Sequence, residues 1–302
     1  MTTGVCDTVR STAPGRPVTQ RLVHKADPAE VLLTCWSRTA PDCFRVATRW
    51  PGDHPFYTAA SGSYEPLLVS ETIRQLFPLL CHAAYDVPFG HHLVWEQYDC
   101  TLEPGALRPG PAAPELRVAC RDLVRRRDRL AAMTMHVELV REGAVHARAR
   151  SRFTVQTPAV YDRLRGPRAD VAGAMAAALP VPEPVRPETV GRDHAEDVVL
   201  SPTDRADRWL LRVDTRHRKL FDHAVDHVPG MLLLEAARQA AQAVRRPARV
   251  LPAEMETSFH RYVELDRPCW IEASPLAAGA VRVTAHQDAE PRFTADVRTR
   301  AF

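Results

Sequence analysis

Two apolar segments of the sequence carry the same charged residues at the same spacing. One contains Glu71 and Arg74, the other contains Glu235 and Arg238, and glutamine follows each arginine. A charged side chain on an apolar helix must be paired, protonated or used in chemistry. We therefore expect each glutamate to have a raised pKa and to be a candidate general base. A structural ion pair between residues three apart explains the same spacing about as well.

The polar turn before the second segment supplies further groups suited to acid–base chemistry. His223, and His54 in the first half, are candidate partners for the acids. Gly230 follows a proline at the expected helix start, where free N–H groups and the positive end of the dipole polarise a carbonyl. His227 lies close to this helix start in the sequence.

These considerations define the candidate site. Arg74 and Arg238 are suited to hold a phosphate or to orient the acid. The catalytic candidates are Glu71, Arg238, His223 and Glu235, and the substrate-binding candidates are Gly230, Arg74, His54 and His227. No metal is assigned, because Val228 precedes proline, and the histidines on either side of Asp226 need not share a face. No cofactor is expected.

The two segments belong to a longer internal repeat. Residues 23–34 match residues 190–201, and residues 45–49 match residues 212–216, both at a spacing of 167. The Asp53-His54 pair then falls near Asp222-His223. We interpret this as a tandem duplication of one unit.

Periodicity predicts the same element order in both halves. Each half begins with two short strands, continues with a long helix and ends with antiparallel strands, which is an α+β arrangement. The expected helix of the first half covers Pro66 to Ala84. The expected domains are a loose tail over 1–20, a first unit over 21–156, a Pro/Ala-rich linker over 157–189 and a second unit over 190–302.

Composition limits the possible classes of function. The 302 residues carry a net charge of +3, which is too small to indicate nucleic-acid binding. Seven scattered cysteines without a C-x-x-C pair favour reduced thiols rather than a disulfide framework. No apolar run is long enough for a signal peptide or a membrane span. We expect a cytoplasmic protein without nucleic-acid or membrane partners, either a monomer of two pseudo-equivalent units or a homodimer.

A family resemblance rests on motifs in both halves. The run His-(loop)-Pro-Gly-Met-Leu-Leu-Leu-Glu-Ala resembles the active-site segment of hotdog-fold dehydratases and thioesterases. The whole chain resembles the A-factor synthase family, which consists of tandem hotdog proteins. The matching segments are 23–25, 30–34, 50–51, 54–57, 66–75, 87–91, 226–239 and 261–265. Gly52 departs from the family's pattern, which has a basic residue after the Trp-Pro pair. The resemblance implies a tandem (double) hotdog fold, in which an antiparallel sheet wraps one long central helix in each unit.

The resemblance also implies an activity. Members of the family transfer a β-ketoacyl group from acyl carrier protein, or from a coenzyme A thioester, to the hydroxyl of dihydroxyacetone phosphate. This is the first step towards γ-butyrolactone, butenolide or furan signalling molecules that control antibiotic and other secondary metabolism. In hotdog dimers the histidine and the acid usually come from opposite units, which would pair His223 and Gly230 with Glu71. Because Glu65-Pro66 replaces Pro229-Gly230 in the first half, we expect a single active site.

Other interpretations stay open at this stage. A hotdog thioesterase or dehydratase would act without a sugar phosphate, and a non-catalytic module would bind an acyl ligand without turnover. Arginine clusters at 125–129 and 245–246 are typical of solvated edges, but they are also suited to dock an acidic carrier protein.

Overall fold

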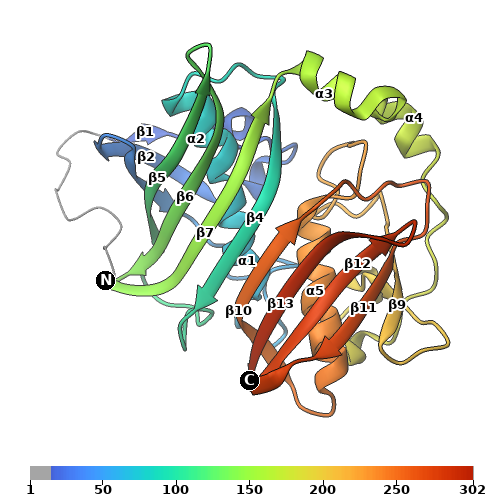
Figure 1. Ribbon diagram of the computed structural model, residues 1–302. Helices are drawn as coiled ribbons and strands as arrows, with labels where there is room; N and C mark the ends of the chain where they lie inside the picture. The colour runs from blue at the N-terminus through green and yellow to red at the C-terminus, as the bar shows by residue number, and fades with distance from the viewer. Residues whose placement is uncertain (1–14, 302) are drawn as a thin grey trace. The chain divides into compact units, whose positions relative to one another are not determined.

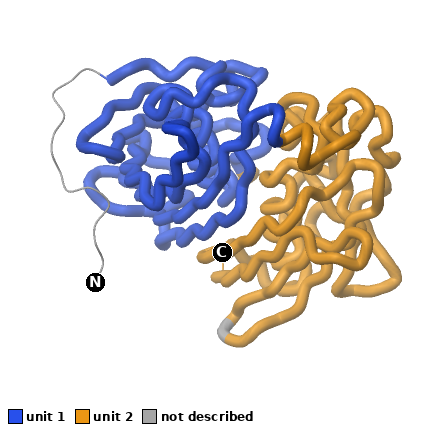
Figure 2. Tube along the Cα trace, turned by 45° about the horizontal axis from the view of Figure 1, so that its top comes forward, with its two compact units in different colours: residues 1–58, 62–160 blue, residues 59–61, 161–302 orange. Residues whose placement is uncertain are grey.

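The computed structural model describes residues 15–301, which form two compact units (Figure 2). The first unit comprises residues 1–58 and 62–160, and the second comprises 59–61 and 161–302. Of the tail expected over residues 1–20, residues 1–14 lie outside the described part, whereas Arg16–Pro17 form a short strand, β1. Residues of the expected linker contribute helices α3 (Pro158–Arg165) and α4 (Val171–Ala176).

The first unit contains an antiparallel sheet with the strand order β1-β2-β3-β5-β6-β7-β4 (Figure 1). Its further strands are β2 (Leu33–Ala40), β3 (Cys43–Thr48), β4 (His92–Leu102), β5 (Glu115–Arg126), β6 (Arg129–Arg141) and β7 (Ala144–Gln156). Successive side chains along each strand point to opposite faces of the sheet, so buried and more exposed residues alternate. In β7, for example, Ala147, Ser151 and Phe153 are buried, while Arg148 and Arg150 are on the opposite face.

The long helix expected over Pro66 to Ala84 is present but interrupted. It consists of α1 (Pro66–Arg74) and α2 (Leu76–Ala84), which meet at Gln75. Pro78 explains the break, because its ring lacks an N–H and clashes with the carbonyl group four residues earlier, that of Arg74. Nearly every side chain of α1 is buried, including Glu71.

The second unit contains an antiparallel sheet with the order β10-β13-β12-β11-β9-β8. Its strands are β8 (Leu200–Ser201), β9 (Arg208–Leu211), β10 (Val250–Phe259), β11 (Trp270–Pro275), β12 (Ala280–Gln287) and β13 (Glu290–Ala301). The sheet packs against one uninterrupted helix, α5 (Gly230–Arg245), which contacts β10, β11, β12 and β13 (Figure 1).

The two sheets share one topology. In each unit the helix is followed by four strands, and the first of these pairs with the last, giving β5-β6-β7-β4 and β11-β12-β13-β10. The strands before the helix extend the other side of each sheet, namely β1, β2 and β3 in the first unit and β8 and β9 in the second. Short 3-10 turns complete the units: Gln20–Val23, Pro28–Glu30, Gly166–Ala169, Pro187–Thr189, Ala195–Asp197 and Ala277–Gly279. The expected α+β repeat, with one central helical segment in each unit, is therefore present.

One expectation about the cysteines is wrong. Cys43 is disulfide-bonded, whereas the sequence pattern favoured reduced thiols throughout. Five cysteines are free, namely Cys35, Cys81, Cys100, Cys120 and Cys269. Among the described residues, no helix combines the length and apolar character needed to cross a membrane.

Candidate functional site

The glutamate of α5 is enclosed by cations. Glu235 has no exposed surface, and its Oε1 accepts hydrogen bonds from Arg192 Nε at 2.7 Å and Arg238 Nη2 at 2.7 Å. Arg238 Nε donates to Oε2 at 3.0 Å, and Gln239 Nε2 donates to Oε1 at 2.6 Å. The (i, i+3) pair read from the sequence is thus part of a larger buried network.

The first unit repeats this network around Glu71. Arg74 forms a bidentate pair with the carboxylate, with both N–O distances 2.8 Å. Lys25 Nζ lies 3.3 Å from Oε1, and Gln75 Nε2 donates to the same oxygen at 3.0 Å. Lys25 and Arg192 occupy equivalent positions at the repeat spacing of 167, a signal present in the sequence but not assigned to the site.

The expectation of raised pKa values is wrong for both acids. Burial raises the pKa of Glu71, but the charges of Arg74 and Lys25 outweigh it and lower the pKa to about 2. Burial likewise raises the pKa of Glu235, and Arg192 and Arg238 lower it to about 2. Each buried carboxylate is therefore ionised at neutral pH and unsuited to serve as a general base near its working pH.

The glutamine after each arginine joins the helix to the preceding loop. Gln75 Nε2 donates to the carbonyl of Glu30 at 2.8 Å, and its Oε1 accepts from the amide of Leu32 at 2.9 Å. Gln239 makes the same two bonds, to the carbonyl of Asp197 at 2.8 Å and from the amide of Val199 at 3.0 Å. These bonds satisfy backbone groups that would otherwise be buried without partners.

The structure identifies His217, rather than His223, as the counterpart of His54. Phe56 and Tyr57 amides donate to His54 Nδ1 at 3.1 Å, and the ring's Nε2 lies 3.2 Å from Glu30. His217 forms the same arrangement. Its Nδ1 accepts hydrogen bonds from the backbone amides of the residues two and three positions later, and its Nε2 lies 3.2 Å from Asp197. Because Nδ1 accepts from two amides, Nε2 carries the proton, and each ring fixes a turn. The repeat spacing of 167 did not reveal this match, because the second unit has four fewer residues before its histidine.

Two predicted site residues have different surroundings from those expected. His223 is exposed over 53% of its side chain, and its Nδ1 lies 3.4 Å from the carboxylate of the neighbouring Asp222. Arg238 is only 2% exposed and is engaged with Glu235, so it is not available to a phosphate in this conformation. Arg74 is 23% exposed, although Glu71 occupies its guanidinium.

A second group of polar residues lies directly before α5. His227 Nδ1 donates to Asp226 Oδ1 at 2.7 Å, because a carboxylate oxygen can only accept. The imidazole packs edge-on against Tyr262, with ring centroids 4.6 Å apart. Its Nε2 makes no hydrogen bond within residues 15–301, and the side chain is 28% exposed. This Asp–His dyad leaves Nε2 able to accept a proton.

Asp226 is held in place by two other side chains. Tyr161 donates its hydroxyl to both carboxylate oxygens at 2.7 and 2.8 Å, and Arg165 Nε donates at 2.9 Å. Arg165 is itself held by a bidentate pair with Glu264, at 2.7 and 2.9 Å. Burial raises the pKa of Asp226, but hydrogen bonds from His227, Tyr161 and Arg165 hold it well below its usual range. The carboxylate therefore stays ionised and orients the imidazole.

The start of α5 lies three residues after the dyad. Pro229 is the N-cap and makes no side-chain capping bond, while the amides of Leu232 and Leu233 donate to its carbonyl. The first amides of the helix, beginning with Gly230, therefore have no intrahelical acceptor and form the positive end of the helix dipole. At the spacing that relates Glu71 to Glu235, the first unit has Gly62-Ser63 in place of the dyad and Pro66 in place of Gly230. The dyad and the open helix start occur together in the second unit.

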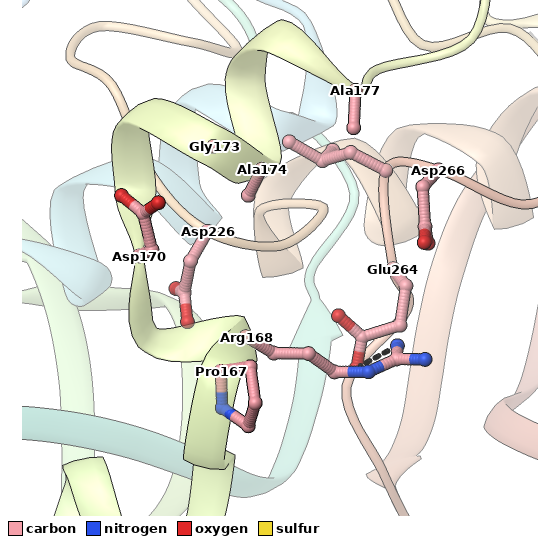
Figure 3. A pocket seen from close by; sticks show the side chains of 10 residues that line it. Pro167, Arg168, Asp170, Gly173, Ala174, Ala177, Asp226, Glu264 and Asp266 are labelled. Atoms are coloured by element: carbon pink, nitrogen blue, oxygen red, sulfur yellow. Dashed lines mark ion pairs between the residues drawn. The ribbon is translucent and has the colours of Figure 1, made fainter.

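Asp226 also lines a pocket, which is shown in Figure 3. Its volume is about 170 Å³. It is lined by Pro167, Arg168, Asp170, Gly173, Ala174, Ala177, Asp226, Glu264, Leu265 and Asp266. Four of these residues are acids and one is an arginine, which already pairs with Glu264 at 3.0 Å. Such a lining repels an anionic phosphate, so we do not place a phosphorylated substrate there.

The buried networks predict a loss of stability in acid. Glu71 and Glu235 have folded-state pKa values of about 2 against an ordinary value of 4.5. Their contribution, roughly 3 kcal/mol each, is present above pH 4.5 and is lost as the pH falls through 2. Urea unfolding at pH 7 and pH 3 measures this loss. Glu235→Gln should show a smaller decrease than the wild type, and an equal decrease in both proteins would contradict the assignment.

Known proteins match the whole chain. A family model described as the A-factor biosynthesis hotdog domain matches residues 6–157 and 173–302. The chain is 48% identical over 290 residues to the 2-oxo-3-(phosphooxy)propyl 3-oxoalkanoate synthase of Streptomyces virginiae, covering 94% of this chain and 97% of that protein. The synthase of the same name from Streptomyces griseus is 41% identical over 302 residues, covering 92% and 94%.

Two solved structures described as thioesterases have a similar fold. A protein described as an oleoyl thioesterase from Lactobacillus plantarum superposes with a TM-score of 0.54 at 11% identity, covering 86% of this chain and 95% of that one. An acyl-ACP thioesterase from Bacteroides thetaiotaomicron gives a TM-score of 0.50 at 8% identity, covering 85% and 97%. At such identities the likeness shows the fold alone. With the two-segment family match, it confirms the tandem hotdog fold.

Proposed function

Because this chain belongs to the A-factor biosynthesis hotdog family, we propose that it is an acyltransferase that joins a β-ketoacyl group to dihydroxyacetone phosphate. The product in the relatives' name, a 2-oxo-3-(phosphooxy)propyl 3-oxoalkanoate, is the ester of a 3-oxo acid with the hydroxyl of dihydroxyacetone phosphate. The acyl donor is a thioester, carried by acyl carrier protein or by coenzyme A.

The observation that carries the mechanism is the Asp226–His227 dyad three residues before Gly230. His227 Nε2 accepts the proton of the acceptor hydroxyl as the oxygen attacks the thioester carbon. Asp226 stabilises the imidazolium that forms, since it is ionised and bonded to Nδ1. The open amides at the start of α5 polarise the thioester carbonyl and bind the oxyanion of the tetrahedral intermediate.

Collapse of that intermediate completes the reaction. The carbon–sulfur bond breaks, the sulfur leaves as a thiolate, and the imidazolium returns the proton to it. The new carbon–oxygen bond is that of the ester. The balance of atoms and charge requires no cofactor.

The helix acids serve a different purpose in this proposal. Glu71 and Glu235 are positioning residues, which hold the central helices against the preceding loops through Lys25 and Arg192. We keep His223 as an exposed residue on the approach to the helix start and assign proton transfer to His227. Since the first unit has no equivalent of the dyad, the proposed reaction has one active site per chain.

A product assay tests the proposal. The purified protein is mixed with a β-ketoacyl thioester, with and without dihydroxyacetone phosphate, and products are quantified by mass spectrometry. The expected product is the phosphorylated ester, formed only when the acceptor is present. Release of free β-keto acid at the same rate in both mixtures would instead identify a thioesterase.

A further inference from the structure

The end of the β5–β6 hairpin protrudes beyond its neighbouring strands in the first unit (Figure 1). β3 pairs with β5 only up to Ala119, and β7 pairs with β6 only from Ala132 onward. The turn residues Arg127 and Asp128 both have positive φ, of 50° and 61°, as a tight two-residue hairpin turn requires. Residues 121–129 are exposed apart from Leu123, which is half-buried.

This hairpin end carries an unusual excess of positive charge. Residues 121–129 contain five arginines and two aspartates, so their excess of three positive charges equals the net charge of the entire chain. Within the described residues, none of the five arginines lies within ion-pair distance of a carboxylate. The arginines of the adjoining β7 differ, because Arg148, Arg150 and Arg152 each face an acid at 3.0–3.6 Å.

Apolar side chains accompany these charges. Val124 is 40% exposed, within the hairpin itself, and Phe89 is 43% exposed in the turn before β4. Burial lowers the pKa of His91, which follows Phe89 in that loop. The positive charge of the nearby Arg129 lowers it further. The half-exposed Phe89 ring packs between His82 and the guanidinium of Arg21. Exposed apolar side chains together with guanidinium groups that face no carboxylate have the composition of a protein-docking surface, in which arginine and aromatic residues are enriched.

We propose that Phe89, Val124, Arg125, Arg126, Arg127 and Arg129 form the docking surface for an acidic acyl carrier protein that delivers the β-ketoacyl thioester. This inference rests on the proposed function, which requires a thioester donor. Unpaired arginines at the tip of a protruding hairpin steer an acidic partner and form charge-assisted hydrogen bonds with its carboxylates. The exposed Phe89 and Val124 supply the apolar contact at the centre of such an interface.

The charge distribution favours a protein over nucleic acid. A duplex binder neutralises many phosphates along a groove, whereas here the excess is confined to one hairpin end and the net charge is +3. An acidic protein of small footprint matches this local excess.

Direct binding tests the surface independently of turnover. A fluorescently labelled holo acyl carrier protein is titrated with the wild type and with the triple variant Arg125→Glu, Arg126→Glu, Arg127→Glu, and Kd is measured by anisotropy. The triple variant should bind at least ten-fold more weakly. A variant with glutamine at the same three positions should have a Kd between those of the wild type and the glutamate variant. The matched control is the triple variant Arg108→Glu, Arg163→Glu, Arg249→Glu, which alters three exposed arginines elsewhere and should change Kd less than two-fold.

Steady-state kinetics separate the two proposals. With carrier-bound donor, the hairpin triple should raise KM at least ten-fold, while KM for the same acyl group on N-acetylcysteamine stays within two-fold. Equal binding by wild type and hairpin triple, equal weakening by the control triple, or tighter binding of a DNA duplex through these arginines would overturn the docking surface. Absence of ester with every donor, with carrier binding still sensitive to the hairpin, would overturn the proposed function alone.

Discussion

Replacing His227 with alanine is expected to lower kcat for acyl transfer by about 10²- to 10⁴-fold, the usual effect of losing a general base. The imidazole is partly exposed, and its main polar contact is with Asp226, so the variant should remain folded. Initial rates of ester formation at saturating donor and acceptor measure the effect, and circular dichroism checks the fold.

His223→Ala is the matched control for this experiment. It removes a second histidine from the same loop, and His223 is 53% exposed with a contact to Asp222 at 3.4 Å. Its rate should stay within a few-fold of the wild type. A large loss in His223→Ala with little loss in His227→Ala would reverse the assignment and restore the role that the sequence pattern first suggested.

The sequence placed candidate residues near the start of α5 but did not show the hydrogen bonds among them. Gly230 was named because a proline-glycine pair begins an apolar helix, which is local information, whereas His227 was named as a substrate-binding candidate and beside a possible metal site. Asp226 was noted only beside a possible metal site. Its partners Tyr161 and Arg165 lie more than 60 residues away, so no spacing rule connects them with it.

Replacing Glu235 with alanine is expected to destabilise the protein by about 3–5 kcal/mol. The change removes the carboxylate that pairs with Arg192 and Arg238, whose side chains are only 4% and 2% exposed. Urea unfolding at pH 7 should show a markedly lower midpoint, and the equivalent Glu71→Ala should behave similarly because Lys25 is 2% exposed.

A compensated variant distinguishes a structural role from a catalytic one. Combining Glu235→Leu with Arg192→Met and Arg238→Leu removes the whole charge cluster, and much of the lost stability should return. The positioning role also predicts that any residual activity follows the folded fraction. An uncompensated Glu235→Ala protein with wild-type stability and no activity would contradict the account and support a catalytic carboxylate.

The fold itself was largely predictable from periodicity. Alternating residues identified the strands, and the repeated Glu-x-x-Arg-Gln register identified α1 and α5 as equivalent helices. The direction in which the pKa of each acid shifts was not predictable, because it depends on a cation contributed from 43 or more residues away. Lys25 and Arg192 were visible as aligned residues in the repeat, but only folding shows that they reach Glu71 and Glu235. Similarly, the break at Gln75 follows from Pro78, which the helix assignment passed over.

The state of the His227 ring is the most direct test of the central claim, that an ionised Asp226 leaves Nε2 free to accept the hydroxyl proton. Nitrogen-15 NMR of histidine-labelled protein reports which ring nitrogen is protonated, and the signal absent from His227→Ala identifies the residue. We predict a neutral-ring tautomer with its proton on Nδ1, as the bond to Asp226 requires, and a shift of the Nε2 resonance when dihydroxyacetone phosphate is added. A proton on Nε2 with Nδ1 bare, unaltered by the acceptor, would contradict the account.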